Sequence, residues 1–349
     1  MPTYKDEKRG TYYCSFYYTD WTGTRKKKKK EGFKKQSEAN QFERDFLTKQ
    51  KNNCDIPFKT LVNLYLDDCK VRVRETTLDN KKYIIDLKIL PYFEKQIVSE
   101  ITPNHIRKWQ NKLLKGGYSA TYLRSINNQI SAIFNFAIKY YNLVSSPALK
   151  AGSMGKKNAD DMQFWTKEEF KKFIEFDDKP ISNLAFKVLF WTGMRSGELM
   201  ALTWNDIDLI NKKIYINKSY TRLNGKDIIA PPKTPKSKRV IAIFDSLCKD
   251  IEDYKEKLYD YKNDERVFNF TKFFLVHEMQ RISKKSRVKK IRIHDLRHSH
   301  ASLLIELKFT PLEIAERLGH EKVQTTLDTY SHLYPDKQNI LANKLDDLY

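Results

Sequence analysis

The chain has 349 residues and a formal net charge of +21, because 65 Lys and Arg stand against 44 Asp and Glu. Hydrophobic residues make up 40% of the sequence and aromatic residues 13%, which excludes a chain that is disordered throughout. No apolar run approaches the roughly 20 residues of a membrane span, and the start lacks the pattern of a signal peptide.

The four cysteines lie far apart and form no CxxC pair, which argues against a disulfide framework and against a zinc module. The length corresponds to two or three domains. We therefore expect a cytoplasmic protein of several domains, whose strong positive charge favours a polyanionic partner.

The first predicted domain, residues 1–52, combines a small sheet with one helix. The aromatic run 11–18 has the composition of a strand, and a turn follows at 20–24. Residues 25–30 are six consecutive cations. Beyond Ser37, a residue typical of helix N-caps, apolar residues recur at helical spacing, so we expect a helix packed on the sheet.

The second predicted domain, residues 53–150, is expected to be entirely helical. Thr102 and Pro103 have the pattern of an N-cap and a first helical residue, and a Gly-Gly pair at 116–117 predicts the end of that helix. Ser119 predicts the start of a long second helix. Residues 151–161 lack periodicity and contain two glycines, so we expect a linker there.

The third predicted domain, residues 162–349, mixes helices with a small antiparallel sheet. Residues 166–169 form a capping box that predicts a helix start. Alternating segments at 213–217 and 240–244 flank an Asn224–Gly225 turn, and helical patterns fill most of the rest. The expected fold class is therefore α+β, with a sheet-plus-helix domain, a helical domain and a mostly helical third domain.

Five short segments of the third domain concentrate side chains that can do chemistry. These segments are residues 192–198, 231–239, 294–300, 318–320 and 325–332. His294 and Arg297 stand three residues apart where a helix is expected to begin, so their imidazole and guanidinium share one helix face and can converge on one anion.

Arg195 and Arg297 suit a phosphodiester, because each guanidinium matches phosphate oxygens with a planar fork. Together they can hold both non-bridging oxygens and stabilise the charge that grows there in a transition state. No carboxylate cluster for Mg²⁺ accompanies them, so we expect no metal and no other cofactor. Tyr330 beside these cations is a candidate nucleophile, because positive charge stabilises its phenolate.

The order and spacing of these segments resemble the tyrosine recombinase (phage integrase) family. The resemblance covers essentially the whole chain, including the small N-terminal sheet domain of integrases from phages and conjugative transposons. The family's catalytic residues match Arg195 with Glu198 three places on, Lys233 in a Lys-Thr-x-x-Ser-x-Arg context, His294 and Arg297 in a His-x-x-Arg box, His320 in a Leu-Gly-His segment, and Tyr330.

The resemblance implies a mechanism. Tyr330 would attack a DNA phosphate to give a 3′-phosphotyrosyl link and a free 5′-hydroxyl, while Lys233 would donate a proton to the leaving oxygen. His294 would assist proton transfer, and His320 would hydrogen-bond the scissile phosphate. Because the phosphotyrosyl bond preserves the energy of the broken bond, religation would need no ATP.

The resemblance also implies DNA contacts outside the catalytic set. The first domain would bind arm-type sites, and the helical second domain would clamp the core-type DNA where strands cross over. The candidate contacts are Arg25, Lys26, Lys27 and Lys28 in the first domain and Lys108, Lys112 and Lys115 in the second. A solvated loop or helix face is the alternative interpretation of both sets.

The implied function is site-specific integration and excision of a mobile element of a phage or a conjugative transposon. A homotetramer would assemble on two double-stranded attachment sites and exchange strands through a Holliday junction, with an excisionase and a host DNA-bending protein as candidate helpers. The alternatives are a Xer-like chromosome or plasmid resolvase, a type IB topoisomerase, and a non-catalytic DNA-binding regulator.

Some residues keep a second interpretation. Lys236 is the alternative to Lys233, because both lie in one lysine-rich segment. His294, His298 and His300 are close enough in sequence for a metal cluster, but neither an HExxH pattern nor an acidic or cysteine partner accompanies them. We therefore expect His298 and His300 to pack or bond locally.

Overall fold

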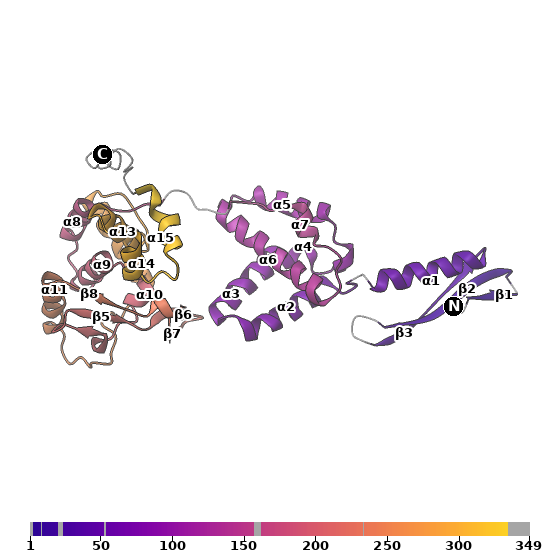
Figure 1. Ribbon diagram of the computed structural model, residues 1–349, viewed down its shortest axis with the longest axis horizontal. Coiled ribbons are helices and arrows are strands. Elements are labelled where there is room, and N and C mark those ends of the chain that lie inside the picture. The colour runs from indigo at the N-terminus through magenta and orange to yellow at the C-terminus, as the bar shows by residue number, and fades with distance from the viewer. Residues whose placement is uncertain are drawn as a thin grey trace, which may run out of the picture. The chain divides into compact units, whose positions relative to one another are not determined.

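The structure is a computed structural model that describes residues 3–7, 9–19, 24–51, 54–156, 162–232 and 234–333. The chain divides into two compact units, Met1–Asp160 and Asp161–Tyr349 (Figure 1). Within the described residues, no helix combines the length and apolarity that crossing a bilayer requires.

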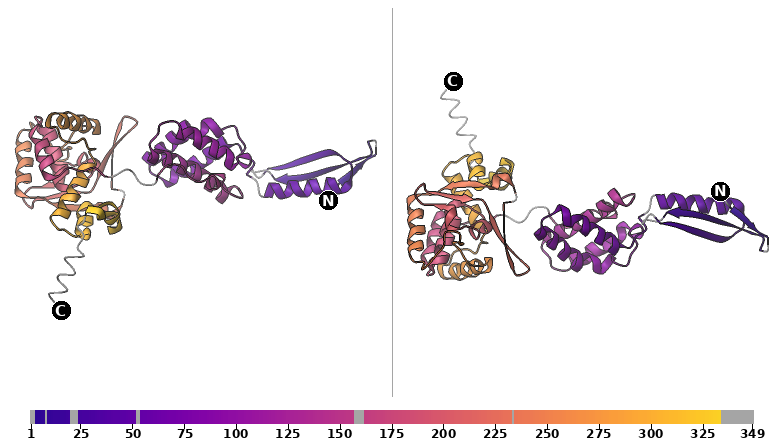
Figure 2. Two further views of the ribbon diagram at one scale, coloured as in Figure 1. Left: turned by 90° about the horizontal axis from the view of Figure 1, so that it is seen from above. Right: turned by 90° about the horizontal axis from the view of Figure 1, so that it is seen from below.

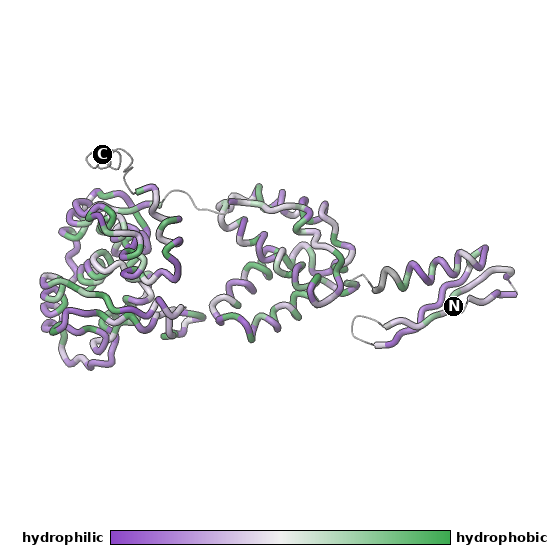
Figure 3. Tube along the Cα trace, viewed as in Figure 1, coloured by the Kyte–Doolittle hydropathy of each residue, from purple (hydrophilic) through white to green (hydrophobic). Residues whose placement is uncertain are grey.

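The first unit begins with a three-stranded antiparallel sheet in the order β1-β2-β3, followed by one helix. Its elements are β1 (Thr3–Asp6), β2 (Thr11–Thr19), β3 (Arg25–Phe33) and α1 (Gln36–Lys51). The helix lies along one face of the sheet (Figure 2), where Ala39 packs with the buried Cys14 and Phe16 of β2. Hydrophobic and hydrophilic residues alternate around α1 (Figure 3), as a helix with one buried face requires.

The expected N-cap of α1 is wrong by two residues, because the helix begins at Gln36 and Lys35 therefore precedes it. Ser37 lies inside the helix, because the carboxylate of Glu38 accepts hydrogen bonds from the backbone N–H groups of Lys34 and Lys35, at 3.1 and 3.4 Å. A side chain from the first turn therefore satisfies the donors that precede it.

The rest of the first unit is a helical bundle around its own apolar core. Its elements are α2 (Phe58–Arg72), α3 (Glu75–Ile84), the π-helical turn η1 (Ile85–Ile89), α4 (Leu90–Phe93), the 3₁₀ turn η2 (Val98–Glu100), α5 (Pro103–Leu114), α6 (Ala120–Tyr140) and α7 (Pro147–Ala151). The predicted caps are confirmed, because the Thr102 and Ser119 hydroxyls accept from the backbone of α5 and α6. Ala151 and Met154 are buried in the bundle core, so the start of the expected linker at 151 is wrong.

The second unit contains two small antiparallel sheets among helices. Its elements are α8 (Lys167–Glu175), α9 (Pro180–Thr192), α10 (Ser196–Leu199), η3 (Trp204–Asp206), β4 (Ile207–Asp208), β5 (Lys213–Ile216), β6 (Ser219–Leu223), β7 (Lys226–Ala230), η4 (Pro235–Ser237), β8 (Arg239–Ala242), α11 (Asp245–Glu256), α12 (Lys272–Ser286), α13 (Asp295–Glu306), α14 (Pro311–Leu318), α15 (Val323–Tyr330) and η5 (Ser331–Leu333). One sheet has the order β4-β5-β8, and β6 and β7 form a hairpin whose turn is the predicted Asn224–Gly225 pair.

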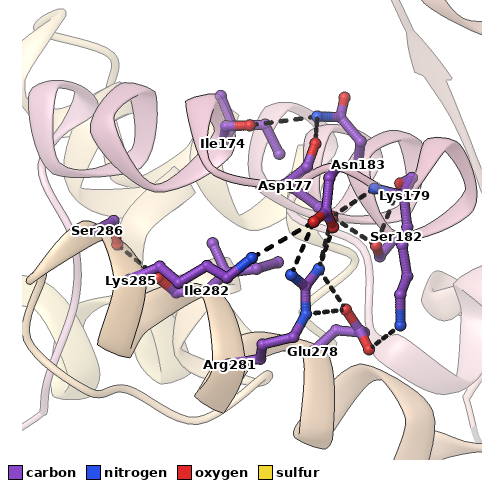
Figure 4. Close-up of polar contacts among 11 residues, drawn as sticks. Ile174, Asp177, Lys179, Ser182, Asn183, Glu278, Arg281, Ile282, Lys285 and Ser286 are labelled. Atoms are coloured by element: carbon purple, nitrogen blue, oxygen red, sulfur yellow. Dashed lines mark hydrogen bonds and ion pairs between the residues drawn. The ribbon is translucent and has the colours of Figure 1, made fainter.

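Helix α9 is apolar on most of its surface and passes through the core of the second unit. A charged network anchors the residues just before α9 to α12 (Figure 4). Arg281 on α12 pairs with Asp178 at 2.6 Å and with Glu278 at 2.7 Å, and Glu278 also accepts from Lys179 at 2.6 Å. These contacts fix the start of α9, and the other end of the same helix leads into segment 192–198.

Candidate active site

Arg297 joins three of the five predicted segments. Its side chain is buried, and its guanidinium donates to the carbonyl of Gly193 at 2.8 Å and to the carbonyl of Leu318 at 2.7 Å. Gly193 ends α9 just before Arg195, and Leu318 ends α14 just before His320. One buried cation on α13 therefore determines where both neighbouring segments lie.

Gly193 must be glycine for two reasons. Its φ is +66°, and a Cβ there would lie 2.5 Å from Cδ2 of His300 and 2.8 Å from Cδ2 of Leu318. A side chain would therefore meet both the left-handed backbone penalty and a packed core. The close approach of α9, α13 and α14 at this glycine brings Arg195 to the site.

Glu198 is a buried carboxylate held by two arginines. Its Oε1 accepts from Nη1 of Arg195 at 2.8 Å and from Nη1 of Arg239 at 3.2 Å. Its Oε2 accepts from the backbone N–H of Arg195 and from Nη2 of Arg239, both at 2.9 Å. Burial raises the pKa of Glu198, but the Arg239 hydrogen bond and the charges of both arginines outweigh it, and the net pKa is lowered.

Arg239 extends this contact to the segment that contains Lys233. Arg239 begins β8, and its Nε donates to the carbonyl of Arg317 at 2.9 Å, while Nη1 donates to the carbonyl of Ser237 at 3.2 Å. Lys233 itself lies outside the described residues. The described residues after it, from Thr234, lead into β8, whose first residue Arg239 contacts Glu198.

Tyr330 is the last residue of α15, and its side chain is only 1% exposed. Its hydroxyl lies 2.8 Å from Nδ1 of His298 on α13. His294 and His298 stand one turn apart, and their rings meet edge to face with centroids 5.3 Å apart. The positive charges of Arg297 and Arg195 both favour the ionised form of Tyr330, so both arginines act electrostatically on the nucleophile candidate.

His320 follows the left-handed Gly319 that ends α14, and its Nδ1 lies 2.8 Å from the Thr326 hydroxyl. Burial lowers its pKa to about 4, and the charges of Arg297, Arg195 and Arg239 add to this effect. His320 is therefore neutral at physiological pH. A neutral imidazole whose Nδ1 is already engaged can offer Nε2 to a phosphate oxygen.

The electrostatics of the site correct one expectation. Arg297 and Arg195 do lower the pKa of Tyr330, as the sequence predicts, but burial outweighs them and raises that pKa to about 12. Arg297 is itself buried, and this burial, together with the positive charges of Arg195 and Arg239, lowers the pKa of Arg297 to about 9. The site without DNA thus holds an excess of poorly solvated positive charge, which an anion would relieve.

His300 turns away from the other two histidines of its segment. It is fully buried, and its Nε2 accepts from Nε of Arg317 at 3.0 Å. Arg317 also donates to the carbonyls of Trp191 and Ala242, at 3.2 and 3.3 Å. His298 instead faces Tyr330, so the metal-cluster alternative does not describe how these side chains are arranged.

Family models match three parts of the chain. The phage integrase family model matches residues 163–337, the SAM-like N-terminal domain of phage integrases matches residues 57–114, and the arm DNA-binding domain matches residues 2–50. The chain belongs to the phage integrase family. It is a tyrosine site-specific recombinase.

Relatives of this recombinase include the ICEBs1 integrase of Bacillus subtilis, 36% identical over 84% of this chain and 83% of that protein. In fold it resembles the Tn1549 transposon integrase in complex with circular intermediate DNA, with a TM-score of 0.68 and 17% identity over 84% of this chain and all of that one. It also resembles the lambda integrase tetramer bound to a Holliday junction, with a TM-score of 0.59 and 19% identity over 92% and 96% of the two chains.

The N-terminal sheet of the recombinase carries cations on both faces. In the antiparallel pair, Lys28 lies across from Phe16, which faces α1, and Lys27 lies across from Tyr17. Odd-numbered residues of this part of β3 therefore share the face away from α1. The Arg25 guanidinium lies 4.3 Å from the centre of the Tyr17 ring on that open face, and Lys28 lies 5.6 Å from the ring of Phe46 on the helix face. Lys26 lies across from Tyr18, on the helix side.

Lys108 and Lys112 are both exposed on α5, whose opposite side buries Ile106 and Trp109. Lys112 lies 5.0 Å from the ring centre of Tyr92. Lys108 and Lys112 therefore lie on the solvent-facing side of α5.

Two residues at the site were missed by sequence reasoning. Arg239 ends the Lys-Thr-x-x-Ser-x-Arg pattern, so the motif itself contained the signal. His298 follows Arg297 directly and lies one turn after His294, but only the fold brings α15 against α13 and shows that His298 meets Tyr330.

Proposed function

We propose that the chain is the integrase of a mobile element and that it inserts and releases that element by recombination at attachment sites. The Tn1549 integrase, whose fold this chain resembles, is the integrase of a transposon. The observation that carries the proposal is that the buried Arg297 holds the segments of Arg195 and His320 through the Gly193 and Leu318 carbonyls, while Tyr330 contacts the same helix through His298. A phosphodiester bound by the two arginines would then lie near a nucleophile.

In the proposed reaction, the Tyr330 oxygen attacks the scissile phosphorus and forms a 3′-phosphotyrosyl bond, while the 5′-oxygen leaves. Arg195 and Arg297 hold the non-bridging oxygens, and His320 donates from Nε2 to the same phosphate. Lys233 protonates the leaving oxygen, and His294 assists this transfer. Religation to another strand reverses these steps, so each strand exchange conserves phosphodiester energy without ATP.

We assign the chain's parts to DNA as follows. Residues 1–52 bind arm-type sites, residues 53–150 bind the core-type site, and residues 162–349 carry out strand exchange. A homotetramer forms the synapse, as the lambda integrase tetramer on a Holliday junction supports. An excisionase and a host DNA-bending protein act as helpers in the bacterial cytoplasm.

The open face of the N-terminal sheet is our candidate arm-site surface. Arg25 and Lys27 lie there beside Tyr17, whereas Lys28 and Lys30 lie over the rings of α1. Replacing Arg25 and Lys27 with Ala should reduce arm-site affinity more than the same replacement of Lys28 and Lys30. Both double variants lose two positive charges, so equal losses in a binding titration would show that net charge alone matters.

A Xer-like resolvase is the second candidate, since it would share the chemistry. The arm DNA-binding domain over residues 2–50 favours the integrase, because a resolvase of that kind usually lacks such a domain. A non-catalytic regulator is disfavoured because the sequence keeps the whole set that matches the family's catalytic residues, Arg195, Lys233, His294, Arg297, His320 and Tyr330.

The test is recombination in vitro between the two DNA ends of the element and its empty target. The wild-type chain should join them, and deep sequencing should place every junction within one short overlap. Arg297→Lys should bind both DNAs and recombine neither, because a lysine cannot reach the Gly193 and Leu318 carbonyls with a planar fork. Relaxation of supercoiled DNA without site preference would instead support the topoisomerase alternative.

A further inference from the structure

The hydroxyl of Tyr330 has one hydrogen-bond partner among the described contacts, and that partner is a second histidine rather than His294. Nδ1 of His298 lies 2.8 Å from the hydroxyl oxygen. The two rings lie with centroids 5.6 Å apart at an angle of 62°, an edge-on arrangement that points the imidazole nitrogen at the phenol. His298 therefore touches the atom that would become the nucleophile.

The position of His298 is determined by the same helix turn that holds the arginine. His298 directly follows Arg297 on α13, and His294 lies one turn earlier with its ring edge-on to the His298 ring. Arg297 is clamped by the carbonyls of Gly193 and Leu318, so the backbone that carries His298 cannot shift without breaking those contacts. The contact is thus built by rigid elements and not by a loop.

His298 has the protonation state that a proton acceptor needs. Burial lowers its pKa to about 4, and the neighbouring charge of His294 acts in the same direction. The imidazole is therefore neutral at physiological pH. With the ring proton on Nε2, Nδ1 presents a lone pair to the Tyr330 hydroxyl.

We propose that Nδ1 of His298 accepts the phenolic proton of Tyr330 during DNA cleavage and returns it during religation. This role rests on the proposed function, because it needs Tyr330 to be the nucleophile. A lone pair of the Tyr330 oxygen forms the new bond to phosphorus, and the bond between phosphorus and the 5′-oxygen breaks with its electrons. The phenolic proton moves to His298, and a separate proton from the general acid reaches the 5′-oxygen.

A partner is needed because burial makes the resting phenol a poor acid. The hydroxyl becomes strongly acidic only as its oxygen bonds to phosphorus, so proton transfer to His298 accompanies bond formation and does not precede it. The imidazolium that results lies beside a phosphate whose negative charge has grown. That anion offsets the burial and the smaller repulsion from Arg297 that disfavour a charged His298 before DNA binds.

His298→Asn is the informative variant, because its side-chain oxygen can keep a hydrogen bond near the Nδ1 position but is not basic. His332→Asn is the matched control, since His332 is exposed two residues after Tyr330. Both variants would first be checked for wild-type melting temperature and DNA affinity. Single-turnover cleavage would then be measured at saturating protein on nicked attachment-site DNA.

The comparison that assigns the role uses DNA with a 5′-bridging phosphorothiolate at the scissile position. Sulfur leaves without a proton, so this substrate rescues a variant that lacks the general acid. We expect His298→Asn to cleave about 10² to 10⁴ times more slowly than wild type on both substrates, and His332→Asn to match wild type. Lys233→Ala should be rescued by the sulfur.

A second measurement keeps the proposal testable if His298→Asn folds poorly. A fluorinated tyrosine at position 330 has a more acidic phenol, so it should speed cleavage by a His298→Gln variant more than it affects the wild-type chain. The proposal is overturned if His298 variants cleave at the wild-type rate, or if the phosphorothiolate rescues them. An adduct formed by Tyr330→Phe would instead overturn the proposed function, which is a different outcome.

Discussion

Glu198 links the two arginines of the site, and its replacement should destabilise the second unit strongly. In Glu198→Gln the Arg239 guanidinium, whose side chain is only 6% exposed, loses its carboxylate while it remains buried. Removal of one partner from a buried ion pair costs about 3–5 kcal/mol, because the other charge is left uncompensated. Arg195 contributes less to this cost, because its side chain is 37% exposed and water replaces part of the lost interaction.

The same reasoning predicts non-additivity. Arg239→Met should also cost about 3–5 kcal/mol, because it leaves the Glu198 carboxylate buried with a single partner. The double variant Glu198→Gln with Arg239→Met should cost clearly less than the sum, since neither buried charge is then left alone. A matched exposed pair, Lys212 and Asp245, should leave stability essentially unchanged when its charges are removed.

Urea unfolding, monitored by hydrogen exchange in peptides from residues 162–333, would measure these changes in unfolding free energy for the second unit separately from the first. Cleavage by the single variants should also fall, because Glu198 orients Arg195. If the two single-variant costs simply add, or if neither exceeds that of the exposed control, the account of Glu198 as the link between Arg195 and Arg239 is refuted.

Three further predictions concern the packing, the titration and the DNA contacts. Gly193→Ala should destabilise the second unit by about 2–5 kcal/mol in thermal unfolding, whereas Gly225→Ala, which has a positive φ but open space around it, should cost only about 1–2 kcal/mol. Burial lowers the pKa of His300 to about 3, so its contribution to stability is present above pH about 6.5 and is lost as the pH falls toward 3. The contribution of His300 to stability should therefore fall by about 2 kcal/mol by pH 5, and His300→Gln should reduce the overall decline by that amount while an exposed control, His277→Gln, should not. For arm-site DNA, the double replacement on the open sheet face should reduce the slope of log affinity against log salt by about 2, and an unchanged slope would contradict phosphate contact there.

Local sequence signals predicted much of the fold, because caps and turns depend on neighbouring residues. The Thr102 and Ser119 caps and the Asn224–Gly225 turn are where the sequence placed them. The predicted N-cap at Ser37 is wrong, because Glu38, a residue of the first turn, supplies the acceptor at the helix start instead. Met154 was assigned to a linker because the sequence around it lacks periodicity, although its side chain is buried in the core of the helical bundle.

The site was less predictable where its properties depend on tertiary packing. Spacing identified Arg195 and Arg297, but nothing in the sequence shows how deeply Tyr330 is buried. That burial reverses the expected direction of the Tyr330 pKa shift. The His298 contact likewise depends on α15 lying against α13, two helices that no local pattern pairs.

The central claim is that Tyr330 is the nucleophile, and covalent trapping tests it most directly. Wild-type protein and Tyr330→Phe would be incubated with nicked DNA from the junction of the element, denatured and separated on a gel. The account predicts a protease-sensitive protein–DNA adduct with wild type and none with Tyr330→Phe, while both proteins bind the DNA equally. An adduct that persists in Tyr330→Phe would contradict it, because another residue would then carry the phosphate.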